Sequence, residues 1–233
     1  MVAGASGGIG SAFVDALLDD PRVGRVTALS RGPVAQRDER LRSATIDFAD
    51  ESSIAAAAEN CGSDIDLVIV ATGILHRDRD IRPEKRLAEV DGATMAEVLR
   101  INTVGPALLA KHFLPLLRRD AKSAFAAISA RVGSISDNRL GGWASYRASK
   151  AALNMLMRTF SIEQSRTNPR SLVVTLHPGT TDTELSKPFQ RNVPESKLFE
   201  PVFVADKLLA VLDGLTPDDS GGFFAWDASR IDY

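Results

Sequence analysis

The sequence has almost no cysteine and no long apolar run. Cys61 is the single cysteine among 233 residues, so no disulfide can form within the chain and a thiolate metal site is not expected. Apolar stretches such as residues 67–71 end long before the ~20 residues that a transmembrane helix needs. The start of the chain has no pattern typical of a secretion signal. These absences favour a protein of the reducing cytoplasm that makes no membrane contact.

An excess of one charge is also missing. The chain carries 28 Lys and Arg residues against 30 Asp and Glu residues, for a formal net charge of -2. This balance gives no reason to expect a nucleic-acid partner. The three histidines, His76, His112 and His177, lack the spacing of metal ligands, so we expect no metal site.

Short apolar stretches alternate with amphipathic ones along the chain. Strands covered on both faces are predicted at residues 25–30, 44–46, 67–71, 124–129 and 172–176. Helical spacing of apolar residues is found over residues 8–18, 52–59, 94–118, 145–165 and 204–212. This alternation predicts a doubly wound parallel sheet between two layers of helices, a three-layer Rossmann fold in a single domain.

Two segments interrupt this alternation. Residues 75–91 are rich in charge and are interpreted as an exposed connection, with the charges at 77–85 solvated or, less simply, in contact with a partner or cofactor. Residues 183–201 hold three prolines and are too irregular for a core element. A long irregular segment in a compact domain is often functional, so 183–201 is a candidate substrate lid.

The first predicted strand is unusually short, because only Met1–Ala3 precede the first glycine. Two interpretations stay open: the natural start lies upstream, or the strand is a stub. The turn that follows has glycines at positions 4, 8 and 10. Such glycines allow a tight strand-to-helix turn and a close approach of a dinucleotide pyrophosphate to the helix N-terminus, although a merely flexible helix entry is the alternative. The residues assigned to this cofactor turn are Gly4, Ser6, Gly7, Gly8, Ile9 and Gly10.

The end of the second strand carries Ser30 and Arg31. An acidic residue there would bind the adenosine ribose hydroxyls of NAD(H), whereas a basic one accepts the 2′-phosphate of NADP(H). The planar guanidinium of Arg31 suits a phosphate, and a solvated loop arginine is the alternative. We therefore expect NADP(H), with NAD(H) the less favoured cofactor.

Tyr146 and Lys150 are four residues apart at the start of a predicted helix, which places both side chains on one face. A free tyrosine has a pKa near ~10, and a nearby ammonium favours the phenolate and so lowers that pKa. A tyrosine tuned in this way can serve as a general acid or base. A lone pair with this spacing is common on helices and by itself indicates little.

The motifs taken together are more specific, since they follow one order along the whole chain. After the glycine-rich turn come Asp47, Ala71-Thr72-Gly73 and Asn102, then Tyr146 and Lys150, and finally Pro178-Gly179 and Thr183. In this order the chain resembles the short-chain dehydrogenase/reductase family. Residues 129–143 resemble its C-factor-like branch, which is related to a bacterial cell–cell signalling protein.

The resemblance implies roles for the catalytic residues. Tyr146 would protonate a carbonyl oxygen or, in reverse, deprotonate an alcohol. Lys150 would bind the nicotinamide ribose and lower the pKa of Tyr146. Asn102 would hold a water that links Lys150 to solvent, and the simpler interpretation, a polar residue that kinks its helix, is compatible with this role.

The resemblance also assigns the cofactor contacts. Asp47 and Phe48 would flank the adenine, and Thr183 would bind the nicotinamide carboxamide. The further residues assigned to cofactor binding are Ala71, Thr72, Gly73, Tyr146, Lys150, Pro178, Gly179 and Thr181.

One departure from the family pattern affects the catalytic serine. The family usually has this serine second in Ser-Ser-x-x-Gly, and here that position is Ala130. Ser129 and Ser134 are the nearest candidates, with spacing slightly in favour of Ser134, and the role could also be absent. Trp143 either lines the substrate pocket or only packs.

The sequence thus predicts an NADP(H)-dependent oxidoreductase that acts on a small carbonyl or alcohol substrate, as a homodimer or homotetramer. The alternative is a cofactor-binding sensor or signalling protein with little turnover, which the missing serine favours. A substrate bound to an acyl carrier is a minor alternative, because the lid offers only Lys187, Arg191 and Lys197 as a basic patch.

Overall fold

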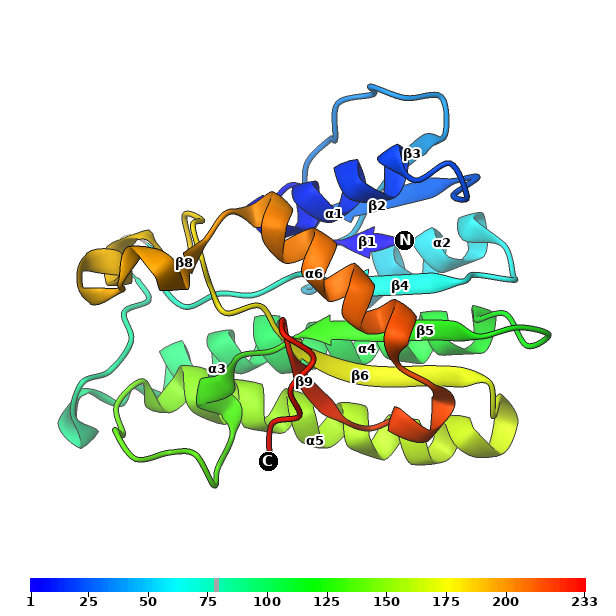
Figure 1. The fold of residues 1–233 in the computed structure, drawn as a ribbon. Coiled ribbons are helices and arrows are strands. Elements are labelled where there is room, and N and C mark those ends of the chain that lie inside the picture. Colours follow the sequence, from blue (N-terminus) through cyan, green and yellow to red (C-terminus); the bar gives the residue numbers. More distant parts are fainter. Residues whose placement is uncertain (78–79) are drawn as a thin grey trace.

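A seven-stranded sheet with every strand parallel forms the centre of the molecule (Figure 1). The computed structural model describes residues 1–77 and 80–233, so part of the predicted exposed connection, residues 78 and 79, lies outside the described residues. The strand order is β3-β2-β1-β4-β5-β6-β9. The strands are β1 (Val2–Ala3), β2 (Val26–Ser30), β3 (Leu41–Thr45), β4 (Leu67–Val70), β5 (Ser123–Ile128), β6 (Ser171–His177) and β9 (Phe223–Ala225).

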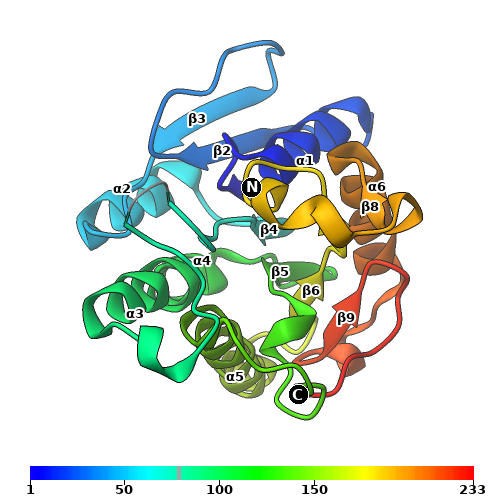
Figure 2. The same cartoon turned by 90° about the vertical axis from the view of Figure 1, so that its left-hand side faces the viewer.

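Helices cover both faces of this sheet. The helices are α1 (Gly8–Asp19), α2 (Glu51–Cys61), α3 (Gly92–Leu99), α4 (Gly105–Phe113), α5 (Ala144–Thr167) and α6 (Pro201–Gly214). Side chains alternate along each strand, so Ala28 and Ile69 pack toward α1 and α6, whereas Leu29 and Val70 pack toward α2, α4 and α5. Figures 1 and 2 show the resulting three layers. The predicted doubly wound fold in a single domain is confirmed. Within the described residues, no helix is both long enough and apolar enough to cross a membrane.

Two strands differ from the sequence prediction because they lie at the edges of the sheet. β3 covers residues 41–45 instead of 44–46. Its first part was not predicted, because the exposed Arg42 and Ser43 interrupt the apolar pattern. β9 was not predicted, since three residues give no periodicity to detect. It pairs with β6 on one side, and residues 229–231 fold back beside it, where Ala225 N donates to Ser229 O and Ile231 N to Phe223 O, both at 2.8 Å.

The helix predicted over 94–118 is wrong as a single element. A π-helical turn at Arg100–Val104 separates α3 from α4, and a 3-10 turn at Leu114–Leu116 follows. Asn102 lies in the π turn, where its amide exchanges two hydrogen bonds with the backbone of Ile74 at 2.7 and 2.8 Å. These bonds hold the widened turn, a feature frequent at functional sites.

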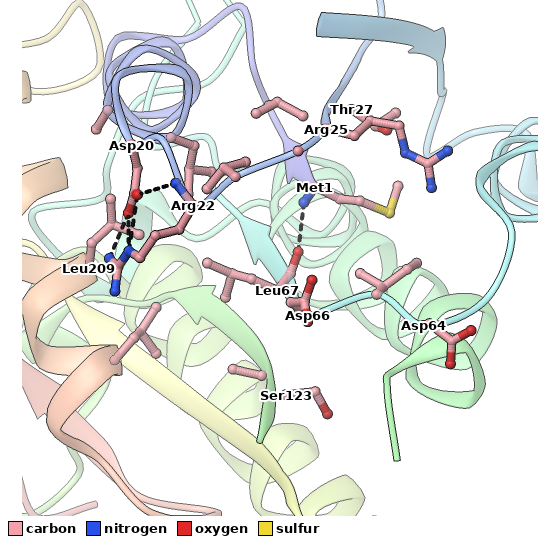
Figure 3. A pocket seen from close by; sticks show the side chains of 18 of the residues that line it. Met1, Asp20, Arg22, Arg25, Thr27, Asp64, Asp66, Leu67, Ser123 and Leu209 are labelled. Atoms are coloured by element: carbon pink, nitrogen blue, oxygen red, sulfur yellow. Dashed lines mark hydrogen bonds and ion pairs between the residues drawn. The ribbon is translucent and has the colours of Figure 1, made fainter. Parts of the chain in front are cut away.

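A cavity of about 970 Å³ lies at the amino ends of the strands (Figure 3). β1 is short, and Val2 pairs with Ala28 and Ile69, so β2 and β4 extend past Met1. The Met1 amino group donates to Leu67 O at 2.6 Å, and burial lowers its pKa to about 6. Ligands of open parallel sheets bind at the carboxyl ends of the strands, so this cavity is not the candidate site.

Candidate active site

The glycine-rich turn joins β1 to α1 at the carboxyl edge of the sheet, the side that faces the viewer in Figure 2. Gly4 has a φ of +84°, and a Cβ built on it would lie 2.8 Å from Ala71 O. A Cβ on Gly10 would lie only 2.1 Å from Gly4 O. Only glycine fits these two positions, because backbone atoms surround both. At these two glycines, the backbone near the start of α1 is therefore not covered by a side chain.

A pocket of about 420 Å³ opens beside this turn. Ten residues assigned to cofactor binding line it: Gly4, Ser6, Gly7, Ser30, Arg31, Asp47, Phe48, Ala71, Thr72 and Gly73. Sequence reasoning did not assign the other lining residues to a cofactor: Ile46, Ile74, His76, Arg77, Glu97, Arg100, Ile101, Glu184 and Leu185. The pocket thus lies between the carboxyl ends of β1, β2 and β4 on one side and the start of the candidate lid on the other.

Polar and aromatic side chains shape the far end of the pocket. Ser30 is buried and its hydroxyl donates to Gly32 O at 2.5 Å, while Arg31 is exposed. The ring of Phe48 packs on Gly105, where a Cβ would lie 2.1 Å from the ring. Gly105 therefore lets Phe48 lie against the first turn of α4.

One charged cluster in the wall was missed. Arg100 donates to both oxygens of Glu97 at 2.8 and 2.9 Å, and Arg77 donates to the same carboxylate at 3.2 Å. These hydrogen bonds lower the pKa of Glu97, so its carboxylate stays ionised. The i,i+3 spacing of Glu97 and Arg100 was the available signal, but such pairs are common on exposed helices.

Tyr146 and Lys150 lie in the first turns of α5, as predicted. Tyr146 is half-buried, and Lys150 is buried with 3% of its surface exposed. The Lys150 ammonium donates to Ile128 O at 2.9 Å and lies 5.8 Å from the centroid of the Tyr146 ring. The structure thus holds a cation next to the phenol at the end of β5.

Burial moves both pKa values of this pair toward the neutral forms. It raises the pKa of Tyr146 and lowers the pKa of Lys150 to about 8. The direction for Tyr146 is opposite to the lowering that the motif predicts. A lower pKa of Tyr146 therefore requires positive charge to outweigh burial.

We expect Lys150 to titrate near pH 8 in the chain without bound ligands. Burial disfavours the ammonium form, so the proton leaves at lower pH than the ~10.4 of a solvated lysine. NMR of lysine Cε groups labelled with ¹³C measures this midpoint, and Lys150→Arg identifies the resonance. The other lysines provide the internal control, and a Lys150 midpoint equal to theirs would contradict the assigned burial effect.

Asn102 lies close to Lys150. It is fully buried, and besides Ile74 its amide donates to Ser149 Oγ at 3.0 Å. A Cβ on Gly73 would lie 3.5 Å from both Asn102 Oδ1 and Lys150 Nζ. The structure therefore brings Gly73, Asn102 and Lys150 together, although they are far apart in the sequence.

The two candidate serines are both buried, with 2% of their surface exposed. The Ser129 hydroxyl donates to Asn154 Oδ1 at 2.7 Å. Ser134 Oγ accepts from Asp137 N and lies near Ser136 Oγ, each at 3.2 Å. Both hydroxyls thus have local partners, while Ala130, at the family's serine position, is partly exposed. The choice between the two serines stays a prediction.

The segment after β6 closes over the glycine-rich turn. A Cβ on Gly8 would lie 2.8 Å from Thr183 Cγ2, so the predicted carboxamide ligand lies above the start of α1. Gly179 has a φ of +73° and packs on Phe199. Within residues 1–77 and 80–233, the buried hydroxyls of Thr72 and Thr181 have no hydrogen-bond partner.

The candidate lid at 183–201 is more ordered than its sequence indicates. It contains 3-10 turns at Lys187–Asn192 and Glu195–Lys197, and its strand β8 (Leu198–Phe199) pairs with β7 (Thr180–Thr181). Phe189 meets two rings edge to face, Trp143 at 5.1 Å and His76 at 5.7 Å. Trp143 in turn meets Tyr146 at 6.3 Å. Rings from three segments thus form a chain of contacts that ends at Tyr146.

A doubly wound sheet with a glycine-rich turn at its carboxyl edge defines the class of Rossmann-type α/β proteins. The family model described as short chain dehydrogenase matches residues 1–194. The chain therefore belongs to the short-chain dehydrogenase family and is an oxidoreductase, in agreement with the predicted resemblance.

Known relatives show how broad this family is. The chain is 38% identical to the C-signal of Myxococcus xanthus over 146 residues, which are 62% of this chain and 82% of that protein. It is 33% identical to the 1-hydroxy-2-glutathionyl-2-methyl-3-butene dehydrogenase of Rhodococcus sp. (strain AD45) over 191 residues, which are 81% of this chain and 78% of the relative. The match to the C-signal agrees with the predicted branch.

Solved structures give the same family. The NADPH-bound carbonyl reductase from chicken fatty liver is 31% identical, with a TM-score of 0.85 over 100% of this chain and 97% of that one. A carbonyl reductase from Pseudomonas aeruginosa PAO1 is 26% identical, with a TM-score of 0.78 over 100% of this chain and 98% of the other.

Proposed function

We propose that the protein is an NADP(H)-dependent reductase of carbonyl compounds, able to oxidise the corresponding alcohols in reverse. One observation carries this proposal: Tyr146 and Lys150 lie beside Gly73 and Asn102, next to a pocket with a bare-backbone turn. An acid–base group next to a pocket at a glycine-rich turn suits hydride transfer. The NADPH-bound relative of similar fold supports the same function.

The residues present fit a nicotinamide dinucleotide. At Gly4 and Gly10 the turn leaves no room for a Cβ, so the tight turn needs glycine there, and a pyrophosphate can approach the N-terminus of α1. The buried hydroxyls of Thr72 and Thr181 have no partner in the described part of the chain, which suits donation to a bound polar group. Asp47 and Phe48 would hold the adenine, Thr183 would hold the carboxamide, and Pro178 and Gly179 would also contact the cofactor. When bound, the cofactor supplies the hydride.

The chain's own contribution is the handling of one proton. Tyr146 would donate its phenolic proton to the substrate oxygen in reduction and accept a proton there in oxidation. Lys150 would hold the nicotinamide ribose, and its charge would counter the burial that raises the pKa of Tyr146. Asn102, bonded to Ile74 and Ser149, would hold a water beside Lys150. Ser129 or Ser134 would polarise the carbonyl if a serine acts at all.

We expect Arg31→Asp to lower the affinity for NADPH by about 10–100-fold and to improve NADH relative to it. The guanidinium lines the pocket after β2, and a charge-assisted hydrogen bond is worth about 1.5–3 kcal/mol. Binding titrations with both cofactors measure this ratio. The exposed Arg119, outside the pocket, provides the charge-matched control Arg119→Asp. If the ratio of the NADPH and NADH affinities is unchanged in Arg31→Asp, Arg31 does not contact the cofactor and is a solvated surface residue.

The function itself is tested by carbonyl-dependent oxidation of NADPH, and separately of NADH, across a panel of ketones and aldehydes. Turnover with NADPH supports the proposal. Binding of both cofactors with no turnover on any substrate would reject it.

A second candidate function is a cofactor-binding sensor or signalling protein. Ala130 at the family's serine position and the similarity to the C-signal favour it. Against it, a pure binding module needs no buried Lys150 beside Tyr146. We therefore place the enzyme first.

The remaining properties follow from this proposal. The substrate would be a small molecule, with residues 183–201 as a lid whose Phe189 faces Trp143. A homodimer or homotetramer would use the helices at 92–113 and α5, where Val104, Met155 and Ile162 are exposed. The cytoplasm is the proposed compartment.

A further inference from the structure

The turn that leads into α5 has an unfavourable backbone conformation. Gly141, Gly142 and Trp143 have φ values of +64°, +67° and +54°, so three successive residues adopt the left-handed conformation. A residue with a Cβ rarely adopts it, and Trp143 has one of the largest side chains. Tyr146 follows within the first helical turn. Contacts that hold this turn therefore also place the phenol.

Glu84 supplies such contacts from about 60 residues earlier in the chain. Its carbonyl oxygen accepts from Trp143 N at 2.5 Å. Its carboxylate accepts from Ser145 N at 3.2 Å and from the Ser145 hydroxyl. Trp143 is the N-cap residue of α5 and makes no side-chain cap, so Glu84 takes over the capping of this helix. A carboxylate at a helix N-terminus is also favoured by the helix dipole.

The prediction that the charges at 77–85 are solvated is wrong for Glu84. Its exposed fraction is 4%, and that of Ser145 is 3%. A carboxylate is buried only where hydrogen bonds replace its water, and here the first turn of α5 provides them. The backbone of Glu84 and its side chain thus hold the same turn at two points.

The segment that carries Glu84 also reaches the pocket. Ile74, which exchanges hydrogen bonds with Asn102, and His76 both line the pocket. His76 meets Phe189, and Phe189 meets Trp143. Residues 74, 76 and 77 thus line the pocket, and Glu84, a few residues later in the chain, contacts the helix that carries Tyr146.

We propose that Glu84 is a positioning residue, which fixes Trp143 and Tyr146 at the start of α5 by capping this helix through Ser145. This inference rests on the proposed function. Glu84 acts through Ser145 and Trp143 and touches no reacting atom. Small displacements of a catalytic group lower rates strongly, about 10²-fold for 1 Å, so the effect falls on kcat.

The test compares Glu84→Ala, Glu84→Gln and Ser145→Ala with the wild-type chain. Glu84→Ala is expected to lower kcat at least about tenfold while the Kd for NADPH stays within about twofold. Glu84→Gln keeps an acceptor for Ser145 N and is expected to recover most of kcat, and Ser145→Ala is expected to be intermediate. The control is Glu89→Ala, from the same segment, where the carboxylate is 37% exposed and pairs with Arg86.

A spectroscopic readout separates positioning from general loss of structure. In a Trp226→Phe background, Trp143 is the remaining tryptophan, and its emission is expected to change in Glu84→Ala but not in Glu89→Ala. The proposal is overturned if folded Glu84→Ala has the wild-type kcat. It is also overturned if the apparent loss of kcat is no larger than the fraction of variant molecules that are unfolded. If the wild-type chain turns over no carbonyl, the proposed function fails, while Trp143 emission still decides whether Glu84 holds this turn.

Discussion

Replacing Tyr146 with phenylalanine is expected to lower kcat for carbonyl reduction by about 10²–10⁴-fold. The substitution removes the phenolic proton, and this is the range that a positioned acid or base contributes. The ring contact with Trp143 at 6.3 Å is retained, so the packing at the start of α5 is preserved. Steady-state kinetics with NADPH and the best ketone of the panel measure the loss.

Two controls belong to this result. The melting temperature is expected to match that of the wild-type chain, because Phe differs from Tyr only by the hydroxyl. The Kd for NADPH is expected to rise by no more than about tenfold, the scale of one lost hydrogen bond, because Tyr146 is one of many residues assigned to the cofactor. If Tyr146→Phe keeps more than about a tenth of the wild-type kcat, Tyr146 is not the proton donor. A parallel loss of NADPH binding would instead show that the substitution damages the pocket.

Replacing Gly10 with alanine is expected to destabilise the protein by about 3 kcal/mol or more and to abolish tight binding of NADPH. The added Cβ would lie 2.1 Å from Gly4 O and 2.7 Å from Gly4 C, and these backbone atoms cannot move aside as a side chain can. Overpacking of this kind typically costs about 1–3 kcal/mol and occasionally more. Denaturant unfolding and a cofactor titration measure the two effects.

Gly7→Ala is the matched control in the same turn. Its Cβ would lie 3.4 Å from Gly4 O, an ordinary contact, and Gly7 has a φ of -84° that alanine adopts. Its cost is expected to stay within about 1 kcal/mol, the scale of an N-cap change. Equal unfolding midpoints for the two variants would refute the assigned role of Gly10.

Strands buried on both faces could be predicted from the sequence, because their apolar residues are continuous. β2, β4, β5 and β6 are of this kind, and each was placed within about two residues. β3 and β9 are the two outermost strands. β3 carries exposed polar residues and β9 has only three residues, so neither gives a continuous apolar signal. The break between α3 and α4 was hidden because Asn102 interrupts a helical pattern only through its bonds to distant Ile74.

Part of the candidate site was predictable because the local backbone, or the spacing along one helix, restricts the residue types. Gly4 and Gly10 are fixed by close backbone contacts, and the four-residue spacing of Tyr146 and Lys150 is local to one helix. Glu84 and Glu97, by contrast, act on segments distant in sequence or on a pocket that exists only after folding. In the sequence, each of them is one acidic residue among many. Charged residues normally indicate a segment that is exposed to solvent, so neither residue is singled out.

The two edges of the central sheet also bear on aggregation. An open strand edge can pair with another molecule and begin a growing cross-chain sheet. Residues 229–231 lie along the outer side of β9, with hydrogen bonds at Ala225 and Ile231, so that edge is already covered. β3 at the opposite edge carries the exposed Arg42, whose charge would have to be brought beside its own copy in an edge-to-edge dimer. The two edges of the parallel sheet are therefore protected, by residues 229–231 on one side and by like-charge repulsion at β3 on the other.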